Sequence, residues 1–409
     1  MNKDNLRKYA PYAVAIVLFA ALSCIYCAPV FQGKELYAGD NVRFKEAVHE
    51  SEQYHAETGE YTWWTGSMFA GMPNYQVGGG HYKSNDLMSF LTRLLRPSHN
   101  NRLPMVLMWY FCCFFILLRS VGIDRWLSII GALATGFSSY FFIIEPAGHH
   151  TKAWSIALMA VVVAGFFFIF RKKYGLGVSL TMIITAMGFS PHPQMAYYVF
   201  MLIGVLFIAE LFIHIKEKRY KDLVISTALF AASALVGMGT GASNVFANRE
   251  YVKETMRGGH SDLVSDQETD APKGLSLDYM TAWSYGIDES LTFLIPGYMG
   301  NASGYNVGTE SVLYKELTSK GVSKADAKQF CESAPTYWGE QPFTAGPVYA
   351  GAAVCFLFIL GLLIVKGPYK WAILVATFFS FALSWGKNWM WLTEFFYNWF
   401  PMYGKFRSV

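Results

Sequence analysis

The sequence predicts an all-α polytopic membrane protein with about nine transmembrane helices and two large loops on its outer, non-cytoplasmic face. One observation is that only 15% of the residues are charged, whereas a soluble domain usually has about a quarter. Another is that these charges cluster between long apolar runs, which is typical of repeated membrane crossing. The net charge of +4 does not indicate nucleic acid as a partner, because most of the basic excess lies in short loops.

Residues 1–31 are predicted to form the first transmembrane helix. The basic residues Lys3, Arg7 and Lys8 precede an apolar stretch that extends from about residue 9 to residue 31. This stretch is too long for the core of a typical signal peptide, and no small-residue cleavage site follows it. We therefore expect the segment to stay in the membrane, with the N-terminus in the cytoplasm.

The remaining predicted helices form two groups, six within residues 104–239 and two within residues 347–385. Two of the runs are shorter than the roughly 20 residues that cross a bilayer core, so they either lie inside the bundle or are extended by polar flanks. These short runs are the second and the fifth helices of the chain, in a series that reads 104–118, 126–144, 153–170, 177–190, 195–215, 223–239, 347–365 and 371–385.

The orientation follows from the basic residues of the connections. Alternate connections are short and positive, at residues 119–125, 171–173, 216–221 and 366–370, which places them in the cytoplasm. The loops at residues 32–103 and 240–346 then lie outside, and we expect both to contain short helices. The aromatic tail, residues 386–409, is predicted to lie at the outer membrane interface as an amphipathic helix.

The first candidate site is Asp40, a few residues beyond the first helix. An acidic side chain just outside a membrane helix is suited to act as a general base or as a metal ligand at the membrane surface. An Asp that follows a glycine is also common in ordinary turns, so both interpretations stay open.

The second candidate site is the connection between the third and fourth helices, which holds Glu145, His149, His150 and Lys152. Lys152 and a protonated histidine would suit a phosphate group, whereas Glu145 with a histidine would suit a metal ion. The alternative is a solvated turn without a function. The density of charge between two apolar helices favours a binding role.

The third candidate site opens the sixth helix, where His192, Gln194 and Tyr197 could hydrogen-bond sugar hydroxyls or phosphate oxygens. Tyrosines at this depth are also common membrane anchors. Arg257, in the second outer loop, could meet a lipid phosphate. The predicted topology puts the three sites at one membrane depth, and this convergence favours a functional site at the outer surface.

Several short motifs lie in order along the chain: Gly39-Asp40, residues 148–152 (GHHTK), 192–198 (HPQMAYY), 251–259 (YVKETMRGG), 337–347 (YWGEQPFTAGP) and 384–388 (SWGKN). The chain also has a first helix, a large outer loop that opens with an acidic residue, and many short-looped helices, which is a GT-C-like layout. On these motifs the chain resembles the bacterial YfhO family of membrane proteins, of the GT-C superfamily of glycosyltransferases, and is similar to its N-terminal portion.

The resemblance implies an inverting glycosyltransferase of the bacterial cytoplasmic membrane. Such enzymes move a sugar from a polyprenyl-phosphate carrier to a cell-envelope glycan or lipid acceptor. The family's catalytic base matches Asp40, often beside a divalent cation such as Mg²⁺ or Mn²⁺. Lys152, Arg257 and His149 or His150 would then stabilise the departing lipid phosphate, with Glu145 beside them. His192, Gln194 and Tyr197 would shape the sugar or carrier pocket.

The main alternative is a transporter or flippase of lipid-linked saccharides that makes and breaks no bond. Such a protein is expected to place polar residues near the bilayer midplane, whereas the apolar runs of this chain contain few polar residues. A non-catalytic scaffold of the cell envelope is a third alternative. Glu210 lies in the sixth helix one turn from its cytoplasmic end, where we expect it to reach the interface rather than to relay protons.

Overall fold

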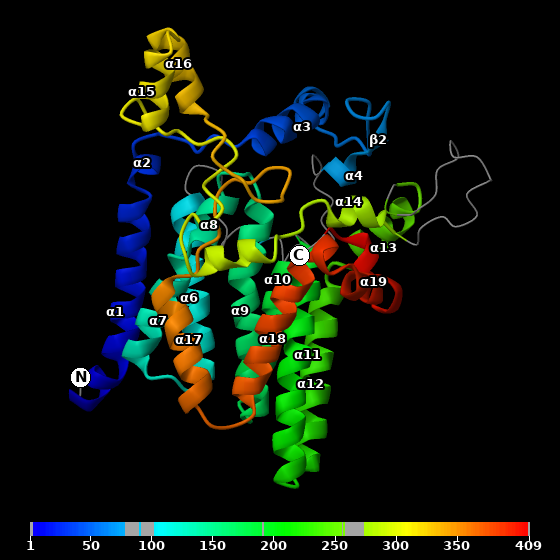
Figure 1. Cartoon of the computed structure of the whole chain (residues 1–409). Coiled ribbons are helices and arrows are strands. Elements are labelled where there is room, and N and C mark those ends of the chain that lie inside the picture. Colours follow the sequence, from blue (N-terminus) through cyan, green and yellow to red (C-terminus); the bar gives the residue numbers. More distant parts are fainter. Residues whose placement is uncertain are drawn as a thin grey trace. The chain divides into compact units, whose positions relative to one another are not determined.

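The computed structural model describes residues 3–77, 90, 102–189, 192–255, 257 and 274–407 (Figure 1). Gly258 and Gly259, which carry part of the family resemblance, lie outside the described residues. The chain divides into two compact units, which are taken one at a time below. Unit 1 consists of Met1–Phe137 and Ile144–Glu250, and unit 2 of Ser138–Ile143 and Tyr251–Val409.

Within the described residues, six helical segments are long and apolar enough to cross a membrane, and they confirm the prediction of an α-helical, multi-pass membrane protein. Three shorter apolar helices stand where the fifth, eighth and ninth crossings are predicted, so the count of nine stays a prediction. The six long segments are Tyr9–Tyr26, Leu103–Ser120, Arg125–Ile144, His150–Phe170, Pro193–Lys216 and Tyr220–Gly239, and the three shorter ones are Tyr174–Gly188, Ala352–Ile364 and Tyr369–Ser384.

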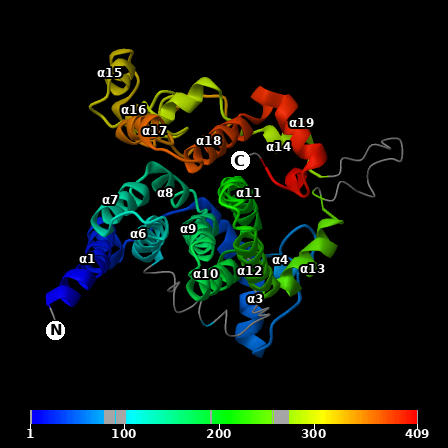
Figure 2. The ribbon, with the colours of Figure 1, turned by 90° about the horizontal axis from the view of Figure 1, so that it is seen from below.

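Unit 1 is a helical bundle built around α9, which packs against α6, α10, α11 and α12 (Figure 2). The apolar window of α9 is 83% buried, as expected for a helix that is apolar on every side. Trp154 and Phe166 of α9 are completely enclosed. The helices of the bundle are α1 (Lys3–Tyr26), α6 (Arg102–Ser120), α7 (Arg125–Gly136), α9 (His150–Phe170), α10 (Tyr174–Phe189), α11 (Pro193–Lys216) and α12 (Tyr220–Gly239).

The two short predicted runs have different explanations. Helix α6 has 19 residues because the polar residues at both of its ends, Arg102 and Arg119, extend it. Helix α10 has 16 residues and crosses α9 closely: a Cβ atom on Gly177 would lie 2.9 Å from the carbonyl oxygen of Gly165. Small residues at such a crossing let two backbones approach, which is common in membrane bundles.

The third predicted crossing, residues 126–144, falls within the long apolar segment Arg125–Ile144, but its helix is interrupted. The segment forms two helices, α7 and α8 (Ser139–Ile144), which separate at Phe137 and Ser138. Ser139 and its neighbours belong to unit 2, where the Ser139 hydroxyl accepts a 2.7 Å hydrogen bond from the Tyr349 amide. A polar side chain that bonds to the backbone in this way competes with helix continuation.

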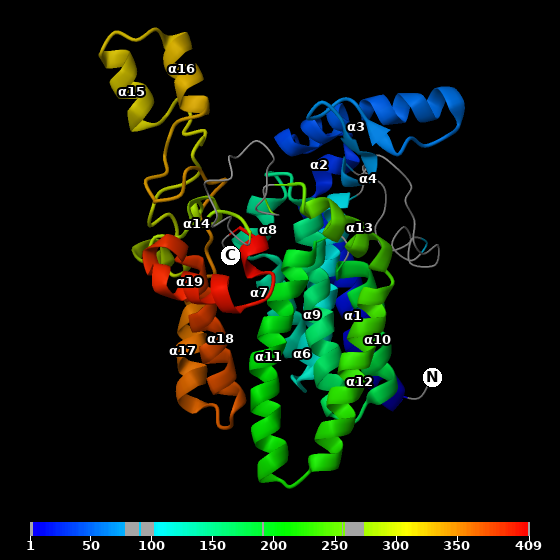
Figure 3. The same cartoon turned by 90° about the vertical axis from the view of Figure 1, so that its right-hand side faces the viewer.

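The first predicted outer loop contains a long helix, not only short ones. Helix α3 (Gly39–Thr58) has 20 residues and lies across the end of the unit 1 bundle (Figures 1 and 3). Glu50 on α3 accepts hydrogen bonds from the Thr65 hydroxyl (2.6 Å) and the Gly66 amide (2.9 Å), which also lower the pKa of Glu50. These bonds hold a small hairpin against α3. The loop's other elements are α2 (Ala28–Phe31), β1 (Trp64–Thr65), β2 (Met72–Pro73) and α4 (Asn74–Val77).

The first outer loop is also joined to α13 (Ala242–Val252), the last helix of unit 1 in the sequence. Gln76 of α4 donates a hydrogen bond to the side chain of Asn248, on α13. Since α13 follows α12 directly, this bond connects the start of unit 1 to its last helices.

Unit 2 contains the hairpin of α17 (Ala352–Ile364) and α18 (Tyr369–Ser384), visible in Figure 3. The predicted tail helix corresponds to α19 (Met390–Trp399), which buries Phe396 and exposes Trp391. Its place at a membrane interface stays a prediction. The other elements of unit 2 are α14 (Leu277–Thr281), η2 (Asp288–Phe293), α15 (Val312–Ser319), α16 (Lys324–Glu332), η3 (Gly386–Trp389) and η4 (Tyr403–Lys405).

The sequence led us to expect that Glu210 reaches the membrane interface from α11, and this expectation is wrong. Its side chain is buried, and one carboxylate oxygen lies 3.3 Å from Nδ1 of His214, which is also buried. The pair is one helical turn apart on the same helix, so both groups face the interior of unit 1.

Candidate functional site

The N-terminal ends of three helices in unit 1 carry most of the predicted site residues. Helix α3 contributes the first of them, α9 and the turn before it contribute the second group, and the N-cap of α11 contributes the last. We call this set the α9 cluster: Asp40, Asn41, Glu145, His149, His150, Lys152 and His192.

A chain of hydrogen bonds runs through the buried side of the α9 cluster. Nδ1 of His150 lies 2.5 Å from Oε2 of Glu145, and Nε2 of the same ring lies 2.8 Å from Oδ1 of Asn41. Glu145 is 1% exposed and His150 is 7% exposed. The chain therefore joins the turn before α9 to the first turn of α3, which are distant in the sequence.

Asp40 packs directly over Gly148. A Cβ atom built on Gly148 would lie only 2.8 Å from Cβ of Asp40, and the φ angle of Gly148 is +90°, in the region that favours glycine. Asp40 itself is exposed, so its carboxylate is open to a ligand. The structure thus brings the first and second predicted sites together.

The basic side of the α9 cluster consists of His149, Lys152 and His192. Burial, followed by the positive charges of Lys152 and His149, lowers the pKa of His192 to about 4. His192 is therefore neutral at pH 7, in which state it can still make the hydrogen bond to a sugar hydroxyl or phosphate oxygen that the sequence suggested. Its Nδ1 atom is buried and has no hydrogen-bond partner among the residues that the structure describes.

Gln194 and Tyr197 lie in the first two turns of α11, next to His192 in the chain. The amide of Gln194 donates a 3.2 Å hydrogen bond to the hydroxyl of Tyr198. The ring of Tyr197 makes an edge contact with Tyr198, with 5.8 Å between centroids. The side chain of Gln194 therefore contacts the neighbouring turn of its own helix.

Arg257 belongs to unit 2. Its guanidinium donates to the carbonyl oxygen of Lys405, and the Lys405 ammonium donates to the carbonyl oxygen of Arg257. Burial lowers the pKa of Arg257, and burial also lowers that of Lys405. This reciprocal contact attaches the start of unit 2 to its C-terminal segment.

The side chains near Asp40 are a poor set of ligands for the predicted metal ion. Within the described residues, no three His, Cys, Asp or Glu side chains lie close enough together to hold a metal. Asp40 supplies a single carboxylate, and Mg²⁺ is usually bound by one or two carboxylates together with phosphates of the substrate. The protein side chains around Asp40 do not form a metal site by themselves.

An apolar groove begins about one helical turn below the basic side of the α9 cluster. It lies between α9, α10 and α11, and nearly all of its lining is apolar. Ser155 at its upper end is one turn from Lys152, and Ala196 is one turn from His192. The groove is lined by Ser155, Leu158, Met159, Val162, Ile184, Thr185, Gly188, Ala196, Val199 and Phe200.

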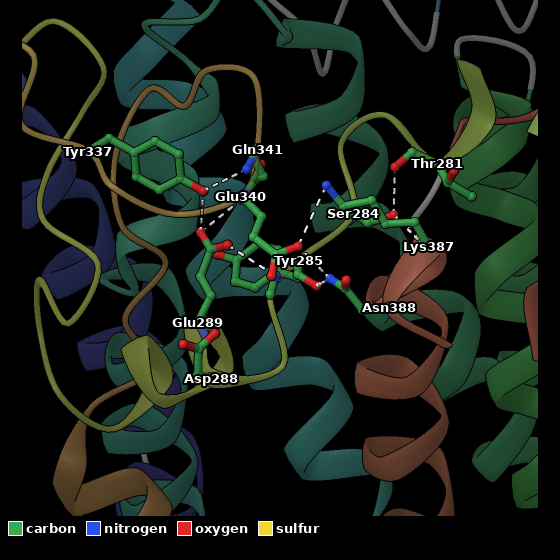
Figure 4. A network of polar contacts seen from close by, with 11 residues as sticks. Thr281, Ser284, Tyr285, Asp288, Glu289, Tyr337, Glu340, Gln341, Lys387 and Asn388 are labelled. Carbon is green, nitrogen blue, oxygen red and sulfur yellow. Dashed lines mark hydrogen bonds and ion pairs between the residues drawn. The ribbon is translucent and has the colours of Figure 1, made fainter. Parts of the chain in front are cut away.

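Unit 2 contains a second polar assembly, the unit 2 network, which the sequence analysis did not identify (Figure 4). Its centre is Glu289, a carboxylate that is 3% exposed. Oε1 accepts hydrogen bonds from the Tyr337 hydroxyl (2.8 Å) and from the side-chain amide of Gln341 (3.0 Å), and Oε2 accepts one from the backbone amide of Gly286 (3.2 Å). Burial and the neighbouring carboxylate raise the pKa of Tyr337, so its hydroxyl remains a donor at neutral pH.

The other half of the unit 2 network is more exposed. The side-chain amide of Asn388 donates to Oε2 of Glu340 (2.9 Å) and to the carbonyl oxygen of Tyr285 (2.8 Å). The ammonium of Lys387 lies 3.5 Å from the same Glu340 oxygen, and its backbone amide donates to Ser284 (2.9 Å). Figure 4 shows these side chains converging on one region of unit 2.

One sequence signal could have indicated the unit 2 network. Each of its three segments contains an aromatic residue followed by glycine, at Tyr285-Gly286, Trp338-Gly339 and Trp385-Gly386. A Cβ atom on Gly339 would lie 2.2 Å from the Tyr337 hydroxyl, and one on Gly386 would lie 2.0 Å from the Ser284 hydroxyl. The glycines are therefore required by close packing, which the sequence pattern alone does not reveal.

Comparisons of the chain with known protein families, with curated proteins and with solved structures found no match in any of the three.

Proposed function

We propose that the protein is a membrane glycosyltransferase that moves a sugar from a polyprenyl-phosphate carrier to a cell-envelope acceptor. The observation that carries the proposal is the position of Asp40. This exposed carboxylate of α3 packs on Gly148, in the short turn that leads to Lys152. The two ends of such a transfer require a base and a cation, and Asp40 and Lys152 would supply them, since Asp40 packs on Gly148 and Lys152 lies four residues after it.

The proposed reaction follows from these two groups. The carboxylate of Asp40 accepts the proton of an acceptor hydroxyl, whose oxygen then forms a bond to the anomeric carbon of the sugar. The bond between that carbon and the phosphate oxygen breaks, and polyprenyl phosphate leaves with the electron pair. Lys152 stabilises the negative charge that develops on the leaving phosphate, and neutral His192 supplies a hydrogen bond. Attack opposite to the leaving group inverts the anomeric centre.

The apolar groove supports a lipid-linked donor over a soluble one. A carrier whose phosphate lies at Lys152 would have its hydrocarbon chain beside α9, α10 and α11, where Leu158 and Val162 line the groove. Because the isoprenoid chain is already surrounded by lipid hydrocarbon, close packing rather than removal of apolar area from water would favour its contact with this surface.

The predicted topology and the family resemblance support the cellular setting. With the N-terminus in the cytoplasm and nine crossings, the α9 cluster lies on the outer face of a bacterial cytoplasmic membrane. The resemblance to the YfhO family of the GT-C superfamily supports the same chemistry and the same position for the base.

The substitution Asp40→Asn tests the proposal in protein reconstituted into lipid vesicles with a radiolabelled polyprenyl-phosphate sugar and a membrane extract as acceptor. Because the amide keeps the shape but cannot take the proton, we expect the transfer rate to fall by about 10²- to 10⁴-fold. Glu46→Gln is the matched control, since it removes an exposed carboxylate from the same helix, and we expect it to transfer at the parental rate.

Parental activity in the Asp40→Asn protein would contradict the assignment of the base. If labelled lipid crosses the vesicle membrane without transfer of its sugar, the protein is a flippase instead. If neither movement nor transfer occurs, the scaffold alternative gains support.

A further inference from the structure

We propose that Glu145 and His150 are positioning residues, which hold Asn41 and with it the first turn of α3, so that Asp40 stays over Gly148. The sequence assigned both residues to substrate binding. The proposal rests on the proposed function for the role of Asp40, and its structural part is testable without activity.

The geometry favours positioning because His150 is bonded at both ring nitrogens and Glu145 is enclosed by protein. Both ring nitrogens of His150 face protein oxygens, at 2.5 Å from Glu145 and 2.8 Å from Asn41. Glu145 is 1% exposed, so almost none of its side chain is open to a substrate. Lys152 and His149 of the same turn are partly or fully exposed, unlike Glu145 and His150.

The contact also connects three separate parts of the chain. Asn41 follows Asp40 in the first turn of α3, His150 is the first residue of α9, and Glu145 follows α8. Removing the bond at Asn41 would leave the α3 end attached through the irregular segment before Gly39 and through packing on Gly148. A base held by one fewer contact samples more positions, and a displacement of about 1 Å can cost on the order of 100-fold in rate.

The second contact of His150 can be tested through position 41. Nε2 of His150 lies 2.8 Å from the side-chain oxygen of Asn41, so a proton on that nitrogen would be donated to this oxygen. A carboxylate at position 41 would accept that bond as well as the amide does.

The experiment compares the variants Asn41→Leu and Asn41→Asp with the parental chain. Both substitutions change a partly exposed residue and leave the buried Glu145–His150 pair intact, so folding is expected to survive. The matched control is Gln53→Leu, which removes an amide side chain that bonds only locally, to Glu57 on the same helix. Hydrogen exchange of the α3 amides and steady-state transfer kinetics are the two readouts.

In Asn41→Leu we expect the amides of residues 42–45 to exchange at least about tenfold faster than in the parent, because the end of α3 is released. The same variant should lose about 10- to 100-fold in kcat, with KM for the lipid donor within about twofold. Asn41→Asp should retain parental exchange and most of kcat, and Gln53→Leu should change neither readout.

The outcomes separate the two proposals. If the parental chain transfers no sugar, the proposed function fails, while the exchange comparison still decides whether Asn41 holds α3. Unchanged exchange in Asn41→Leu overturns the positioning role. A raised KM with unchanged kcat overturns it as well, because it would place Asn41 in ground-state binding of the donor. Loss of protection in Asn41→Asp would show that Nε2 of His150 is not a hydrogen-bond donor to position 41.

Discussion

The α9 cluster and the unit 2 network are similar in composition and differ in how their hydrogen-bonding capacity is used. In the network, both oxygens of Glu289 accept bonds from neighbouring groups, and Tyr337 both donates and accepts. In the cluster, Oε1 of Glu145 and Nδ1 of His192 are buried without a hydrogen-bond partner among the described residues. A dense group of polar residues therefore does not by itself mark a site, and unused bonding capacity near an exposed acid is the better indicator.

Substituting one lysine from each region tests this difference most directly. Lys152→Gln should lower kcat/KM for the lipid donor by about 100-fold, because a charge-assisted bond to phosphate contributes roughly 1.5–3 kcal/mol. Lys387→Gln should leave kcat/KM unchanged, since Lys387 pairs with a half-exposed Glu340 at 3.5 Å.

Both lysine variants are compared by transfer assay at equal amounts of folded protein. An equal loss of activity in the two would remove the distinction between a functional cluster and a structural network.

Glu289→Gln should be the most destabilising polar substitution in the unit 2 network. The new amide can accept from Tyr337 and Gln341 but then turns its NH₂ group toward the Gly286 amide, which leaves two donors facing each other. We expect a loss of about 2 kcal/mol in the free energy of unfolding. Denaturation of the detergent-solubilised protein measures this loss, and a stable variant with lowered activity would instead make Glu289 a functional residue.

Tyr337→Phe should have a smaller effect in the same direction. The substitution removes the hydrogen bond to Glu289 and the one from the backbone amide of Gln341. We expect the free energy of unfolding to fall by about 1–1.5 kcal/mol. Tyr305→Phe is the matched control, since Tyr305 is exposed. An equal fall in the free energy of unfolding for Tyr337→Phe and Tyr305→Phe would contradict the structural role of the Tyr337 hydroxyl.

The smallest predicted effect is a pH dependence from His192. Its folded pKa of about 4 lies below the ordinary value of 6.5, so between these values only the unfolded chain takes up the proton. Stability should therefore fall as the pH drops from about 6.5 to about 4, by about 1 kcal/mol because the ring is partly solvated. His192→Gln should flatten this part of the profile, and an unchanged slope would show that another group is responsible.

The sequence predicted the broad fold and the approach of the candidate sites well, because membrane hydropathy and loop charge are strong constraints. It placed Asp40 and the residues 145–152 at one depth, and the structure brings Asp40 onto Gly148. The sequence analysis did not predict the break after α7, although Gly136, Ser138 and Ser139 interrupt the apolar run there.

The unit 2 network and the partner of Glu210 were missed for different reasons. Glu289 is bonded by Tyr337 and Gln341, roughly fifty residues away, and no local periodicity encodes such a contact. His214 is only one turn from Glu210, but the expectation that a charged residue near a helix end points to the interface outweighed that spacing.

The joint placement of the starts of α3, α9 and α11 has an electrostatic consequence. Each helix begins near residues of the α9 cluster, at Gly39, His150 and Pro193, and the first turn of any helix exposes backbone N–H groups with a partial positive charge. That contribution does not titrate. The attraction of this region for an anion should therefore persist at pH values where all its histidines are neutral, and only its screening by salt should weaken it.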